Sequence, residues 1–108
     1  MPFGNYPYGQ NDSVFNATPT FDLSIGDVFT MTLTGNVTSM TMNNAQTGHT
    51  YTFIFKQDGF GLHSVAWPAS FKGVISIPVT SVANTAAVQR VVYDGTNFYG
   101  TAIGQLNL

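Results

Sequence analysis

The sequence predicts an all-β protein: an antiparallel β-sandwich or jelly-roll-like barrel of about seven or eight short strands with an extended N-terminal arm. After residue 28, apolar and polar residues alternate with a period of two, as they do in strands that bury one face. Turn-forming residues interrupt this alternation about every eight to twelve residues. No segment combines helical spacing with capping residues. A sheet of this many strands is expected to fold over on itself.

The composition of the 108-residue chain narrows the classes of function. It has three Lys or Arg, five acids and no Cys, which gives a net charge of −2. Three cations are too few to drive nucleic-acid binding, and no apolar run approaches the roughly 18 residues of a membrane span. Without Cys the chain has neither disulfides nor thiolate metal ligands. A surface of Thr, Asn, Ser and Gln favours docking to copies of itself or to a partner, although strand propensity alone is an alternative explanation for the Thr content.

Residues 1–20 are predicted to form an extended arm, followed by a single β-sandwich domain over residues 21–108. Three Pro and two Gly interrupt the arm and prevent regular structure. The arm contains four aromatic side chains, those of Phe3, Tyr6, Tyr8 and Phe15. We expect these rings to dock on a partner, or alternatively to strap over the protein's own core. The N-terminus lacks the basic flank and apolar core of a signal peptide, so synthesis in the cytoplasm is expected.

The first long strand begins near residue 28 and places Phe29, Met31 and Leu33 on one face. The turns and strands that follow, in chain order, are a turn at 35–36, a strand with Met40 and Met42, a loop over 43–48, strands at 51–56, 63–67 and 74–77, and a hairpin of 88–93 with 98–103 around 94–97. The predicted core consists of Phe29, Met31, Leu33, Met40, Met42, Tyr51, Phe53, Phe55, Val65, Trp67, Ile75, Val92 and Phe98.

The sequence contains no arrangement of residues that is typical of catalysis. Asp58 and Asp94 are each followed by Gly, where Asp is an ordinary turn former rather than half of a glycosidase carboxylate pair. His63 lies in an alternating strand, and His49 lies in a loop. No nucleophile elbow surrounds any Ser, and two His without Cys or Glu leave few metal ligands. We therefore predict no enzyme, with no catalytic, cofactor-binding or metal-binding residue.

Trp67, the only Trp in the chain, has two possible roles. An exposed indole on a β-sandwich stacks readily on a sugar ring, whereas a buried one fills the core near a sheet edge. The strand sequence HSVAWP favours the core role, and glycan stacking by Trp67 is kept as the alternative.

Three segments carry a resemblance to a known group of proteins. They are FTMTLTGNVTSMTM, YTFIFKQDGFGLHSVAWP and VVYDGTNFYG, spread over residues 28–104. They resemble a small β module of tailed-phage virion proteins, which is found in tail fibres, tail-associated proteins and short capsid decoration proteins. The shared motifs are turns and core aromatics, so the resemblance implies a fold and a place in the virion, and it carries over no catalytic residue.

The resemblance and the single module with an arm together suggest a capsid decoration, or cement, protein. Such a protein is expected to form a homo-oligomer, with a trimer favoured and a dimer possible. It is expected to staple neighbouring major capsid protein subunits on the capsid exterior through apolar burial and strand-edge pairing. The alternative is a tail or tail-fibre component that binds host-surface carbohydrate.

Overall fold

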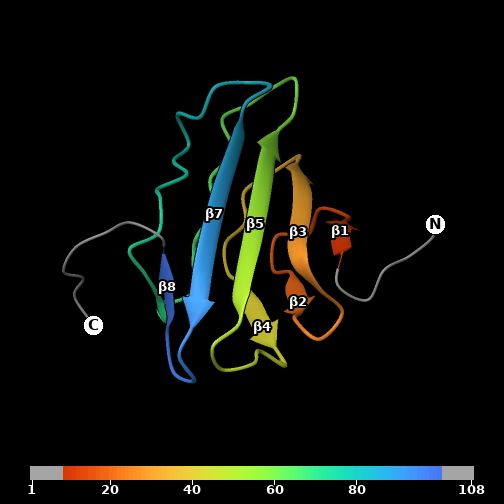
Figure 1. Cartoon of the computed structure of the whole chain (residues 1–108). Helices are drawn as coiled ribbons and strands as arrows, with labels where there is room; N and C mark the ends of the chain where they lie inside the picture. The colour runs from red at the N-terminus through yellow and green to blue at the C-terminus, as the bar shows by residue number, and fades with distance from the viewer. Residues whose placement is uncertain (1–8, 101–108) are drawn as a thin grey trace.

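A computed structural model of the chain describes residues 9–100, which form eight strands and no helix. The strands are β1 (Gly9–Ser13), β2 (Thr20–Asp22), β3 (Gly26–Leu33), β4 (Thr41–Asn43), β5 (Thr50–Gln57), β6 (Phe71–Lys72), β7 (Ala86–Tyr93) and β8 (Phe98–Gly100). Six of them form one sheet in the order β1-β3-β5-β7-β8-β6, and β2 pairs with β4 in a second, smaller sheet (Figure 1). In the described part of the chain, no helix is available to cross a membrane.

The N-terminal half of the fold is a stack of parallel rungs. Successive strands alternate between the two sheets, so that β1, β3 and β5 lie in the large sheet and β2 and β4 in the small one. Asn11 pairs with Phe29, and Phe29 pairs with Phe53, in each case in parallel. Each turn of the chain thus places a strand beside its equivalent from the previous turn, as in a solenoid.

The all-β prediction is confirmed, whereas the predicted antiparallel, jelly-roll-like arrangement is wrong for this half of the chain. The pairs β1–β3, β2–β4 and β3–β5 are all parallel, and so is the short β6–β8 pair in the C-terminal half. The physical reason is that a period of two shows only which face of a strand is buried, and this period is the same in parallel and antiparallel sheets.

The C-terminal half contains the antiparallel pairs. β7 pairs with β5 along its length, and β8 returns beside β7. The hairpin predicted around residues 94–97 is confirmed, because the Asp94 amide donates to the Asn97 carbonyl (3.1 Å) and the Asp94 carboxylate accepts the amides of Thr96 and Asn97. The structure describes β8 as far as Gly100, so residues 101–103 of the predicted strand lie outside the described residues.

The core lies between the two sheets and is largely aromatic. Phe21 from β2 makes edge-on contacts with Phe29, Phe53 and Phe55 of the large sheet, at ring-centroid distances of 5.7, 5.4 and 6.5 Å. Phe29 stacks on Phe53 of the next rung at 5.7 Å. The buried apolar residues are Phe21, Leu23, Phe29, Met31, Leu33, Val37, Met40, Tyr51, Phe53, Phe55, Val65, Phe71, Ile77, Val91 and Phe98.

Most of the predicted core is confirmed, but two of its members are wrong. Ile75 and Val92 are 42% and 41% exposed, whereas Ile77 and Val91 are buried in their place. The error at Val92 arises in a run with apolar residues on both faces, where periodicity does not indicate which face turns inward. The error at Ile75 has another cause: the predicted strands at 63–67 and 74–77 do not form, and only an isolated bridge joins Val65 to Ile77. Met42 and Trp67 are half-buried against the core.

The described part of the predicted arm belongs to the fold of its own chain. Residues 9–13 form β1, which pairs with β3, and the half-buried Phe15 packs against the core. Phe3, Tyr6 and Tyr8 lie outside the described residues. Docking of their rings on a partner therefore stays a prediction.

Candidate functional site

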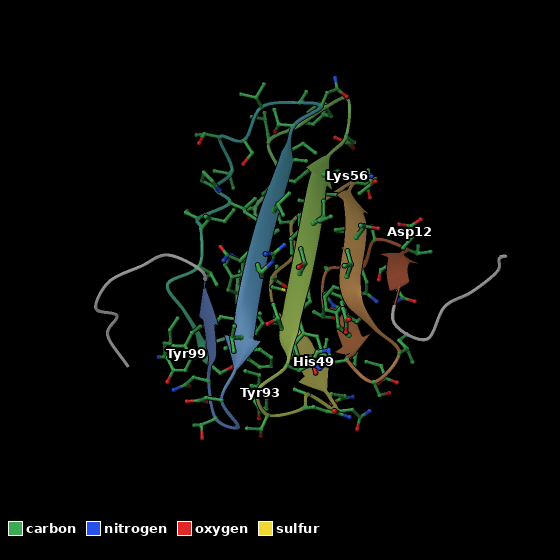
Figure 2. All side chains as sticks on the ribbon, viewed as in Figure 1. Asp12, His49, Lys56, Tyr93 and Tyr99 are labelled. Atoms are coloured by element: carbon green, nitrogen blue, oxygen red, sulfur yellow. The ribbon has the colours of Figure 1, made fainter. Side chains whose placement is uncertain are left out.

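The candidate site is the outer face of the six-stranded sheet, which is the side that points away from β2 and β4. Strand alternation sends every second side chain of β3, β5 and β7 to this face, while Phe29, Phe53 and Val91 point into the core. The register aligns the outward side chains in rows across the strands. By this register the outer face includes Thr30, Thr32, Thr50, Thr52, Ile54, Lys56, Lys72, Val88, Arg90, Val92 and Tyr99. Figure 2 labels Lys56 and Tyr99 among them.

A cleft of about 490 Å³ opens at one edge of this face, where β1 ends. Asp12 and Lys56 contribute opposite charges to it, and the Thr30 hydroxyl donates a hydrogen bond to the Asp12 carboxylate. The lining also contains Ser13, Thr32, Thr34, Val14 and Phe15. Hydroxyls both donate and accept hydrogen bonds, so this cleft suits a ligand with many hydroxyl groups of its own.

The charged side chains are distributed unevenly over the fold. All three cations project from the outer face. Lys56 pairs with Thr32, Lys72 with Tyr99 and Arg90 with Thr52, and paired residues of neighbouring strands point to the same side of a sheet. The described residues include every Lys, Arg and Asp of the chain, and among them no carboxylate lies within 4 Å of any of these cations. The outer face therefore carries three cations, and none of them forms an ion pair with a described carboxylate.

The five carboxylates, in contrast, are engaged by their own chain. Asp22 accepts hydrogen bonds from the Ser24 amide and hydroxyl and from the Asn44 side chain. Asp27 contacts the His49 imidazole at 2.5 Å, which joins the beginnings of β3 and β5. Asp58 and Asp94 each accept amides of the turns they begin, and Asp12 accepts from Thr30.

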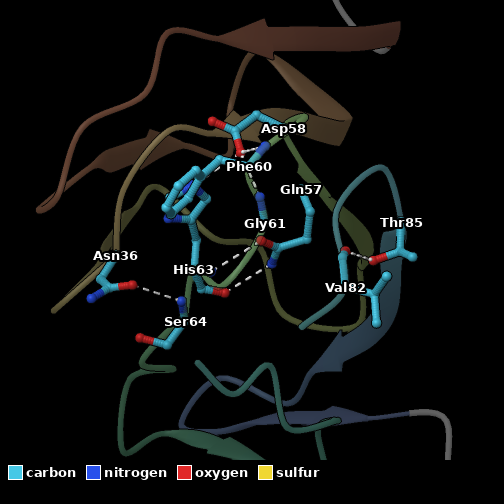
Figure 3. A network of polar contacts seen from close by, with 9 residues as sticks. All are labelled: Asn36, Gln57, Asp58, Phe60, Gly61, His63, Ser64, Val82 and Thr85. Carbon is cyan, nitrogen blue, oxygen red and sulfur yellow. Dashed lines mark hydrogen bonds and ion pairs between the residues drawn. The ribbon is translucent and has the colours of Figure 1, made fainter. Parts of the chain in front are cut away.

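A second feature is the loop after β5, which a network of polar contacts holds in place (Figure 3). The side chain of Gln57, only 6% exposed, accepts the His63 amide (3.1 Å) and donates to the His63 carbonyl (2.8 Å). The Asp58 carboxylate accepts the amides of Phe60 and Gly61 and contacts the His63 imidazole at 3.0 Å. This network holds Phe60 outward, 76% exposed.

The structure locates the residues that the sequence analysis considered as site candidates. Asp58 and Asp94 form turns as expected, and the described residues contain no group of three or more His, Cys, Asp or Glu positioned to hold a metal ion. Trp67 packs against Phe53, Phe55 and Phe71, and its indole nitrogen donates to the Ile75 carbonyl. Stacking of a glycan on Trp67 stays a prediction.

Phe60 is the exposed aromatic that the sequence analysis missed. Among the described residues it is the one aromatic side chain that is mainly exposed, and it lies between Gly59 and Gly61. That position was the available signal, since neither glycine beside Phe60 offers a side chain on which its ring could pack; its ring contact is with His63, at 6.2 Å between centroids.

Acidification is expected to weaken the fold through its turn carboxylates. The Gly61 amide, together with the Phe60 amide and His63, holds the pKa of Asp58 below its ordinary value. A lowered pKa stabilises the fold above the ordinary value of about 4, and this contribution is lost as the pH falls through the lower, folded-state value. We expect the urea midpoint to fall as the pH is lowered from 5 towards 3, and less steeply in Asp58→Asn, which keeps the acceptor oxygen. Equal pH slopes for both proteins would contradict this role for Asp58.

The fold defines an all-β, solenoid-like module. A family described as "Putative phage tail fibre C-terminal domain" matches residues 13–98, which is well over half of the chain. The chain belongs to this family, and with it to the structural proteins of phage virions. No match to the chain was found among curated proteins or among solved structures.

Proposed function

We propose that this protein is a non-enzymatic module of a phage tail fibre that binds host-surface carbohydrate at the cleft between β1 and β3. The family match supports the tail-fibre assignment. The observation that carries the binding function is the lining of the cleft, where a carboxylate, an ammonium group and several hydroxyls surround a space of about 490 Å³. Such convergent polar groups fix the orientation of a small ligand.

The family match also favours the tail over the capsid exterior that the sequence suggested. Capsid decoration and contact with a major capsid protein have no specific support in the family match or in the fold. Association of copies into a trimer or a dimer is kept as part of the proposal.

Binding of the full-length protein to a panel of purified bacterial surface polysaccharides, neutral and acidic, tests the proposed function. We expect Thr32→Val with Thr34→Val to weaken binding by about three- to tenfold for each hydrogen bond lost, because both hydroxyls line the cleft and both residues are exposed. Calorimetry or biolayer interferometry measures the change.

Thr41→Val is the matched control, since Thr41 is exposed on β4 of the small sheet and does not line the cleft. This variant should bind as the unmodified protein does. If the chain binds no polysaccharide of the panel and no bacterial cells, carbohydrate binding is wrong. If the cleft variant and the control bind equally well, the location of the site is wrong.

A further inference from the structure

We propose that the outer face selects acidic polysaccharides, with Lys56, Arg90 and Lys72 forming a line of cations that contacts successive carboxylate or phosphate groups of one chain. This inference rests on the proposed function and specifies the chemical class of its ligand. It starts from an asymmetry in the described residues: every cation projects from one face with no carboxylate within 4 Å, while each carboxylate, including that of Asp12 at the edge of this face, is engaged by its own chain.

The sheet register sets the spacing of the line. Arg90 pairs with Thr52, four residues before Lys56 on the same strand. With a rise of about 3.3 Å per residue and about 4.8 Å between strands, the Cα atoms of Lys56 and Arg90 lie about 14 Å apart. Lys72 pairs with Tyr99, which pairs with Val92, and this places Lys72 about 12 Å from Arg90. The line crosses the sheet diagonally and begins at the cleft, which Lys56 also lines.

The surface between the cations suits a sugar polymer. Val88 and Val92 are exposed there at 59% and 41%, and Ile54 and Thr50 of β5 lie opposite them. Pyranose rings present both C–H faces and hydroxyls, so such a mixed surface matches them, whereas a nucleic acid requires many more phosphate contacts than three cations supply.

A second copy of this chain is a less suitable partner for the line of cations than an acidic polymer. Its carboxylates are already held by turn amides, hydroxyls and imidazoles, as Asp58 and Asp94 show. Using them across an interface requires breaking these bonds, which a polymer with free acidic groups avoids.

The test compares one set of hexuronate-containing bacterial capsular polysaccharides in native form and after carboxyl reduction, which removes the charge and keeps the sugar backbone. We expect the full-length protein to prefer the native form at least about tenfold, with log K falling against log salt no more steeply than a slope of about −2 for three contacts. Arg90→Gln with Lys72→Gln should reduce the preference by about two- to fivefold for each cation. Binding of neutral polysaccharides should not change.

Two controls separate charge from shape. Arg90→Lys keeps the charge and should retain most of the preference, and Val82→Thr, at an exposed side chain outside the strands of the outer face, should leave the preference unchanged. Equal affinity for native and reduced polysaccharides, or an unchanged preference in the double variant, would overturn the line of cations and leave carbohydrate binding intact. Equally tight binding of double-stranded DNA would also overturn it. Failure to bind any polysaccharide would overturn both proposals.

Discussion

Replacing Phe53 with Ala is expected to lower the free energy of unfolding by about 3–5 kcal/mol, the usual cost of removing a buried aromatic ring. Phe53 is fully buried. Its ring contacts Phe21 from the small sheet, Phe29 from the preceding rung, Trp67 from the loop after β5, and Phe71 from β6. The substitution therefore opens a cavity where both sheets and two rungs meet. Urea unfolding followed by circular dichroism measures the change.

Phe60→Ala is the matched control, because it makes the same chemical change at a side chain that is 76% exposed. Exposed substitutions usually change stability by no more than about 0.5 kcal/mol, and we expect Phe60→Ala to fall in that range. Similar losses in the two variants would contradict the placement of Phe53 in the core and of Phe60 on the surface.

The second large effect is expected at Gly61, whose backbone has φ = +72°. A Cβ atom at this position would lie 2.6 Å from the Ala83 amide nitrogen and 2.9 Å from its Cα atom. Gly61→Ala thus adds a left-handed strain of about 1–2 kcal/mol to an overpacking cost of about 1–3 kcal/mol. We expect the melting temperature to fall by at least about 8 °C, with loss of the contact between the loops after β5 and β6.

Gly59→Ala in the same turn provides the comparison. No atom lies within 4 Å of a Cβ placed there, and Gly59 is not among the residues with positive φ. Its melting temperature should stay within a few degrees of that of the unmodified protein. If Gly61→Ala is equally harmless, the two loops do not meet as closely as the structure places them.

The turns and strand faces that depend only on residues adjacent in the sequence were predictable from it. The hairpin around Asp94 follows from four consecutive turn formers, and the inward faces of β3 and β5 follow from alternation that is apolar on one side. Where both faces are apolar, as at Val91 and Val92, the orientation was predicted wrongly. The cross-strand pairing with Tyr51 settles it, since Val91 lies opposite a buried residue.

The candidate site was less predictable than the fold. Lys56, Lys72 and Arg90 are scattered along the sequence, and they share one face only because β5, β6 and β7 lie in one sheet with a particular register. Asp12 and Lys56 meet at the cleft because β1 and β5 both flank β3. The spacing of these residues along the sequence predicts neither of these two arrangements.

The sequence by itself determined the all-β class, the main turns and most of the core, because period-two alternation and turn chemistry act over a few neighbouring residues. The tertiary structure alone decided that the N-terminal strands pair in parallel rungs and that the cations gather on one face. Strand partners are chosen by contacts between residues far apart in the chain, as when Phe29 stacks on Phe53 beneath Phe21. Parallel and antiparallel partners bury the same face of a strand, so only the complete packing distinguishes them.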